Sequence, residues 1–143
     1  MIISNTVSDE VVRLLEAGIN KHLNKSFRYR PLRYFYRKFQ RNNPQAVANA
    51  RHIASQDIAQ VLSQIMGYND SNFVVNGQAT DDGKLFFKRV YNIGINLLKK
   101  RLTVMQSFRA ITNSDFRMQV YDFILKSVQK SASDLMQNAT VNN

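Results

Sequence analysis

The stretch that decides the fold is residues 81–106, DDGKLFFKRVYNIGINLLKKRLTVMQ, in which apolar side chains recur every three or four positions. Apolar residues at this spacing share one face of a helix with 3.6 residues per turn. That stripe consists of Phe86, Val90, Ile93, Leu97 and Met105, widened by Leu98 and Leu102. We expect one long helix here, capped by Thr80 or Asp81 and packed closely against a neighbour at Gly94.

Four other segments repeat this pattern, and the chain contains only five Gly and two Pro to interrupt them. We expect helices over residues 9–23, from 31 to the break at 43–44, over 44–66 and over 115–135. Ser8 is the expected cap of the first helix, and Phe123, Ile124 and Val128 are expected to face inward from the last. The sequence therefore predicts an all-α single domain over residues 1–143, with about five helices and a polar C-terminal tail at 138–143.

Residues 68–80 interrupt the helical pattern. Phe73, Val74 and Val75 precede Asn76-Gly77, a pair typical of the type I′ turn of a β-hairpin. Residues 78–80 make a poor second strand, so we expect a short loop or β-hairpin. A weaker alternative is a helix-turn-helix unit, because residues 55–62 have some similarity to its first helix.

Composition excludes several classes of site. With 44% hydrophobic residues the chain can bury a core, and without cysteine it has no disulfide, zinc finger or thiol nucleophile. His22 and His52 stand without a nearby acid in a catalytic pattern, and no phosphate loop or metal motif occurs. We therefore expect no enzyme, no catalytic residue, no metal and no cofactor. We also expect no membrane span and no cleaved signal peptide.

The most informative segment is residues 26–41, SFRYRPLRYFYRKFQR, in a chain whose net charge is +10. Residues 17–56 contain no carboxylate, so these cations are not neutralised locally. Concentrated Lys and Arg displace counterions from nucleic-acid phosphates. Interleaved aromatic rings can stack on unpaired bases, and Phe27 and Tyr29 are the favoured candidates. The predicted phosphate-binding residues are Lys25, just before this segment, and within it Arg28, Arg30, Arg33, Arg37, Lys38 and Arg41.

Helical geometry divides the roles within this segment. At 100° per residue, Leu32, Phe35, Tyr36 and Phe39 cluster on one face, and we expect them to hold the helix to the core. Arg33, Arg37 and Arg41 fall on another flank, which we expect to face the partner. A second basic patch comprises Lys99, Lys100 and Arg101, preceded by Lys84, Lys88 and Arg89. Such a charge run is also typical of a solvated helix face.

These features favour a structural subunit of a larger nucleic-acid-containing assembly, of the virion connector or neck type. Its basic face would meet the phosphate backbone, and we expect a homo-oligomer located in a virion or the cytoplasm. One alternative is a free-standing, sequence-tolerant DNA- or RNA-binding regulator. A weaker alternative is an adaptor or inhibitor that docks on an acidic protein surface.

Overall fold

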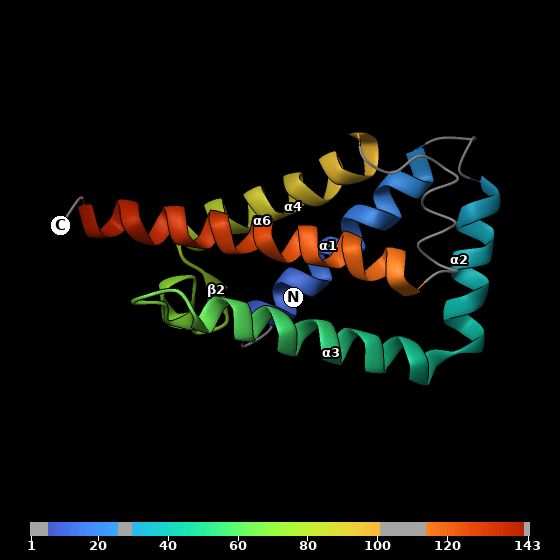
Figure 1. The fold of residues 1–143 in the computed structure, drawn as a ribbon, viewed down its shortest axis with the longest axis horizontal. Helices are drawn as coiled ribbons and strands as arrows, with labels where there is room; N and C mark the ends of the chain where they lie inside the picture. The colour runs from blue at the N-terminus through green and yellow to red at the C-terminus, as the bar shows by residue number, and fades with distance from the viewer. Residues whose placement is uncertain (1–5, 26–29, 101–113, 142–143) are drawn as a thin grey trace.

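The computed structural model describes residues 6–25, 30–100 and 114–141. Within them the α-helices are α1 (Val7–Lys25), α2 (Arg30–Asn42), α3 (Pro44–Ser63), α4 (Asp81–Lys100) and α6 (Ser114–Val141). Helix α1 packs against α3 and α4, and α6 packs against both α4 and α3. Figure 1 shows α2 standing across one end of this group of longer helices. The predicted all-α domain with a short hairpin is confirmed.

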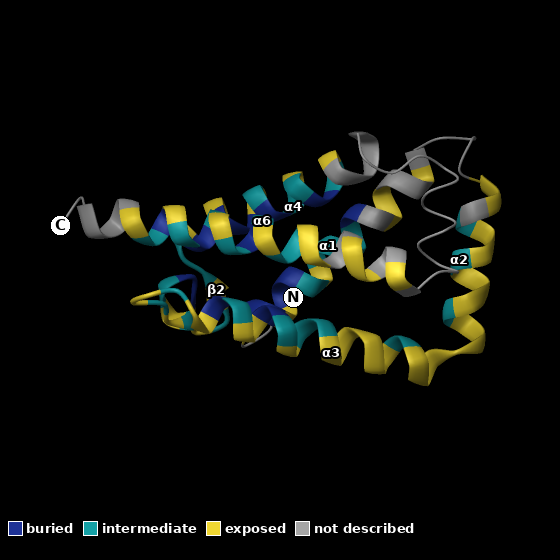
Figure 2. Cartoon of the chain, viewed as in Figure 1, coloured by how far each residue is buried: buried dark blue, intermediate teal, exposed yellow. Residues whose placement is uncertain are grey.

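The hydrophobic core lies at the end of the molecule away from α2 (Figure 2). It combines the first half of α1, the second half of α3, the start of α4 and the second half of α6. Its buried residues are Val7, Val11, Ile58, Leu62, Phe73, Val74, Phe86, Phe87, Val90, Val128, Ala132 and Leu135. Burial of these side chains is the main force that holds the helices together.

The predicted hairpin between α3 and α4 is confirmed. A 3₁₀ turn (η2, Asp70–Asn72) leads into strands β1 (Val74–Val75) and β2 (Gln78–Ala79), which pair antiparallel. Asn76 and Gly77 have φ angles of 53° and 75°, as a type I′ turn requires. The helix-turn-helix alternative is wrong, because the segment where its recognition helix would lie, residues 69–75, contains the 3₁₀ turn η2 and strand β1 instead.

Side-chain caps decide where two helices begin. Thr80 caps α4: its Oγ1 accepts the N–H of Gly83 at 3.0 Å and donates to the Asn72 carbonyl at 2.7 Å. Helix α1 begins earlier than predicted because the Oγ1 of Thr6, not Ser8, accepts the N–H of Asp9 at 3.4 Å. Ser8 is instead buried, and its Oγ accepts a hydrogen bond from Ser55 at 3.1 Å.

Helix α6 extends beyond its predicted C-terminal end, whereas the predicted end of α4 falls outside the described residues. No Gly or Pro follows Gly94, and α6 continues to Val141, so residues 138–141 of the predicted polar tail are helical. Residues 101–106, expected to end the fourth helix, lie outside the described residues. The close packing predicted at Gly94 is confirmed, because a Cβ there would lie 3.1 Å from Leu15 Cδ2 on α1.

Three phenylalanines that we expected in the core are exposed. The exposed fractions of Phe35, Phe39 and Phe123 are 52%, 49% and 40%. Helix α2 stands at the end of the molecule and packs mainly against α1 and α3, so it buries a narrow face. That face carries Tyr36, Gln40 and part of Arg33, which turns Phe35 and Phe39 onto a flank.

Candidate nucleic-acid interface

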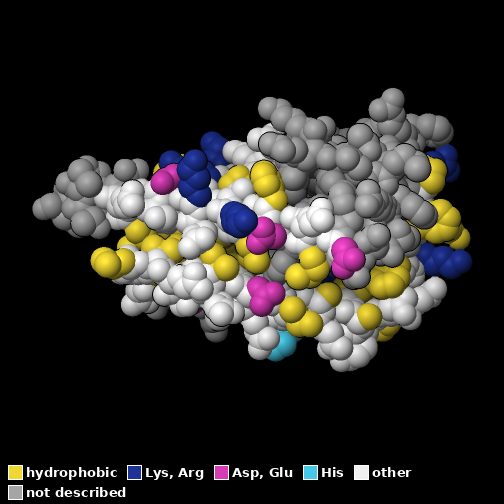
Figure 3. Space-filling model, in the orientation of Figure 1, with side chains coloured by type: hydrophobic (Ala, Val, Ile, Leu, Met, Phe, Trp, Pro, Cys, Tyr) yellow, Lys and Arg dark blue, Asp and Glu magenta, His cyan; other side chains and the backbone are white. Residues whose placement is uncertain are grey.

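The cationic side chains of α2 surround a shallow hollow. Pro31 suits the first turn of this helix, where its missing N–H costs nothing, and no acid occupies that turn. The hollow measures about 570 Å³ and is lined by Arg30, Arg33, Tyr34, Arg37, Gln40 and Arg41. We call this group the arginine hollow. Figure 3 shows Lys and Arg side chains at the right-hand end of the molecule, where Figure 1 places α2.

Two of these arginines share a neutral acceptor on α1. Arg33 Nη1 and Arg37 Nη2 donate to Asn24 Oδ1 at 3.3 and 3.0 Å. An amide oxygen orients the guanidinium groups without cancelling their charge. In the described ranges, no carboxylate lies within ion-pairing distance of Arg33, Arg37 or Arg41. The arginine hollow therefore concentrates positive charge that an anionic partner can neutralise.

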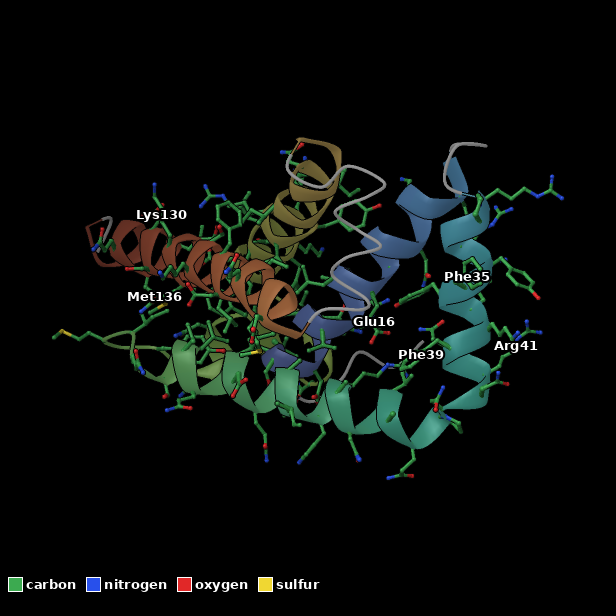
Figure 4. The ribbon with its side chains drawn as sticks, turned by 45° about the vertical axis from the view of Figure 1, so that its right-hand side comes forward. Glu16, Phe35, Phe39, Arg41, Lys130 and Met136 are labelled. Carbon is green, nitrogen blue, oxygen red and sulfur yellow. The ribbon has the colours of Figure 1, made fainter. Side chains whose placement is uncertain are left out.

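A cluster of three side chains from different helices positions α2. Arg51 Nε of α3 donates to Glu16 Oε1 of α1 at 2.6 Å, and half-buried Tyr36 of α2 lies close to both. Burial raises the pKa of Tyr36, and the charge of Glu16 raises it further, while Arg51 opposes this. Figure 4 shows Glu16 and Arg41 on opposite sides of α2, so the local carboxylate faces away from Arg41.

This cluster predicts a loss of stability at alkaline pH. The pKa of Tyr36 is raised in the folded chain. Its contribution to the free energy of unfolding is therefore present below about pH 10 and is lost as pH rises further. We expect the free energy of unfolding to fall less steeply above about pH 10 in Tyr36→Phe than in the wild type. Urea titrations across this pH range measure it, and identical slopes would contradict the assignment.

A second tyrosine supplies the positive control for that experiment. Tyr68 OH donates to Asp70 Oδ1 at 2.7 Å, and burial together with this bond raises the Tyr68 pKa well above its ordinary value. Tyr68→Phe should therefore also flatten the alkaline fall in stability.

The structure brings together only part of the predicted site. Arg30, Arg33, Arg37 and Arg41 meet in the arginine hollow, whereas Lys38 is exposed outside its lining. Lys25, Lys99 and Lys100 lie in α1 and α4, but nothing is described of their side chains. Arg28 and Arg101, and the stacking candidates Phe27 and Tyr29, lie outside the described residues.

Sequence reasoning missed three features of this site. Tyr34 lines the hollow, although the sequence marked it only as one of several interleaved aromatic residues. Asn24 orients two arginines from another helix, and nothing in its local sequence indicates that contact. Glu16 and Arg51 likewise meet only through the packing of α1 against α3.

The second basic region is more balanced in charge. Arg89 and Lys130 line a hollow of about 390 Å³ that also contains Asp134. Lys84 and Lys88 are exposed on α4. This arrangement matches a solvated, mixed-charge surface between α4 and α6 better than a phosphate-binding groove.

The residues that the structure describes carry no metal-binding cluster and no membrane-spanning helix. No group of three or more His, Asp or Glu side chains there could hold a metal ion. None of the described helices is long and apolar enough to cross a membrane. No family model, curated protein or solved structure matches the chain.

Proposed function

We propose that this protein is a non-enzymatic structural subunit of a nucleic-acid-containing assembly, and that the arginine hollow of α2 contacts the phosphate backbone. The observation that carries the proposal is the set of four arginines around one hollow, Arg30, Arg33, Arg37 and Arg41. Two of them are held by the neutral Asn24, so their positive charge is retained. Guanidinium groups bind phosphate oxygens through paired N–H donors.

The proposed contact is electrostatic and tolerant of sequence. Among the described residues, the lining consists mainly of guanidinium groups and Gln40 is its only amide. Amides are among the side chains that read base edges. Phosphate contacts position a protein on nucleic acid without selecting a sequence. We therefore expect affinity to fall steeply with salt, with little difference between oligonucleotides of different sequence.

The double substitution Arg37→Gln with Arg41→Gln tests the proposal. Both side chains are exposed, so stability should change by about 0.5 kcal/mol or less per site. Affinity for a 20-nucleotide oligo(dT) should fall by about 5–30-fold, from two screened charge contacts. The salt slope should become shallower by about 1.4 on this single strand. Fluorescence anisotropy over a salt series measures both quantities.

The matched control removes the same charge elsewhere. Lys126 and Lys130 are exposed on α6, and Lys126 pairs with Asp122 at 2.9 Å. Lys126→Gln with Lys130→Gln should change affinity by about 2-fold or less, because it alters net charge but not the arginine hollow. Equal losses in the two double variants would mean that net charge alone drives binding, and would reject the proposed site.

The assembly part of the proposal has its own measurement. Light scattering should give a particle mass that falls after nuclease treatment, with more than one copy of the chain per particle. A chain that remains a monomer of 16.5 kDa both with and without nucleic acid would contradict a structural role in an assembly.

A further inference from the structure

Tyr34 occupies the arginine hollow with an exposed ring. Its exposed fraction is 57%, and it lines the hollow together with Arg30 and Arg37. The Tyr34 ring meets the Phe35 ring edge-on, with centroids 5.6 Å apart and planes at 74°. More than half of Tyr34 stays accessible despite this contact. An aromatic ring is thus presented among phosphate-binding groups.

The Tyr34 ring lies between cationic side chains because of the spacing of residues on the helix. Residues three or four positions apart are neighbours on a helix surface, so Arg30 and Arg37 lie one turn before and one turn after Tyr34. Arg30 to Arg41 covers about 16 Å along the helix axis. A strand that follows this row of arginines passes directly over the tyrosine.

An exposed aromatic ring can interact differently with single strands and with duplexes. In a duplex the base faces are stacked on one another and are not available to a side chain on the outside. In a single strand an unpaired base can turn toward the protein and stack on an aromatic ring, which contributes about 1–3 kcal/mol per base. Arginine contacts to phosphate are available in both forms, whereas stacking on the Tyr34 ring needs an unpaired base.

We propose that the arginine hollow binds single-stranded nucleic acid in preference to duplex, with Tyr34 as the stacking platform for an unpaired base. This inference rests on the proposed function and specifies its ligand. The exposed flank that carries Phe39 is separate from the arginine hollow, because the side chains of Phe39 and Arg41 point to opposite sides of α2 (Figure 4).

Affinity measurements with two ligands test the role of Tyr34. The probes are a 20-nucleotide oligo(dT) and a 20-base-pair duplex of mixed sequence, at the same ionic strength. Tyr34→Leu should weaken oligo(dT) binding by about 5–150-fold, and change duplex binding by about 2-fold or less. Tyr34→Phe, which keeps the ring, should retain the wild-type preference. Equal effects of Tyr34→Leu on both ligands, or no effect on either, would overturn the stacking role.

A fluorescence experiment tests stacking in a way that does not depend on affinity. The chain contains no tryptophan, so Tyr34→Trp introduces a single indole into the hollow. Its emission should be quenched by oligo(dT) and much less by the duplex. Phe39→Trp, on the other flank of α2, is the matched control and should respond to neither. Equal quenching at both positions, or none at position 34, would count against the proposal.

The outcomes separate this inference from the proposed function. If Arg37→Gln with Arg41→Gln weakens both ligands while Tyr34→Leu weakens neither, the hollow binds phosphate but does not select single strands. If the arginine variant binds both ligands as the wild type does, the proposed function itself is wrong.

Discussion

Gly83→Ala is expected to lower the free energy of unfolding by more than about 4 kcal/mol, which is exceptional for the addition of a single methyl group. A Cβ at this position would lie 1.9 Å from the Phe73 carbonyl oxygen and 2.8 Å from its carbon. That carbonyl cannot withdraw easily, because it accepts the N–H of Thr80 at 3.0 Å. The cap of α4 and the hairpin would have to separate.

The measurement is a urea titration followed by circular dichroism. Gly18→Ala is the matched control, because Gly18 also lies in a helix, α1. A Cβ there would lie 3.6 Å from Ile95 Cγ1 of α4, which is an ordinary van der Waals distance. Alanine is favoured over glycine inside helices by about 1 kcal/mol, so this variant should be neutral or slightly more stable. A Gly83→Ala protein as stable as Gly18→Ala would show that the contact between α4 and the hairpin is not as close as described.

Phe86→Ala should lower the free energy of unfolding by about 3–5 kcal/mol. Phe86 is fully buried, and its ring stacks on that of Phe73 with centroids 4.8 Å apart. Removing it leaves a cavity at the point where α4 meets the hairpin. Thermal melts and urea titrations measure the loss.

The same substitution at Phe39 gives the contrast. Phe39 is about half exposed, so Phe39→Ala should change stability by about 1 kcal/mol or less. The sequence pattern alone predicted the opposite, with Phe39 in the core. Comparable losses at Phe86 and Phe39 would mean that α2 packs with its aromatic flank inward.

Local signals were sufficient for most of the fold. The stripe through Phe86 and Val90, the Asn76-Gly77 turn and the Thr80 cap each depend on neighbouring residues, and the structure confirms them. Helical periodicity also grouped Phe35 with Phe39. It could not show which face of α2 turns inward, because that depends on where α2 stands against α1 and α3.

The candidate site likewise has one part that the sequence predicted and another that it could not. The row of arginines on α2 follows from helical spacing, and the sequence predicted it. The neutral contact with Asn24 and the Glu16–Arg51 pair join separate helices, and no local pattern encodes such contacts. The sequence favoured Phe27 and Tyr29 for stacking, which lie outside the described residues, and within those residues the hollow presents Tyr34.

The most direct test of the proposed interface is an NMR titration of the arginine side-chain Nε–Hε signals with oligo(dT). The account predicts that Arg30, Arg33, Arg37 and Arg41 shift together. Arg13 and Arg51, already paired with Glu10 and Glu16, should stay unchanged. Shifts spread evenly over all arginines, or none in α2, would contradict the claim that this helix contacts nucleic acid.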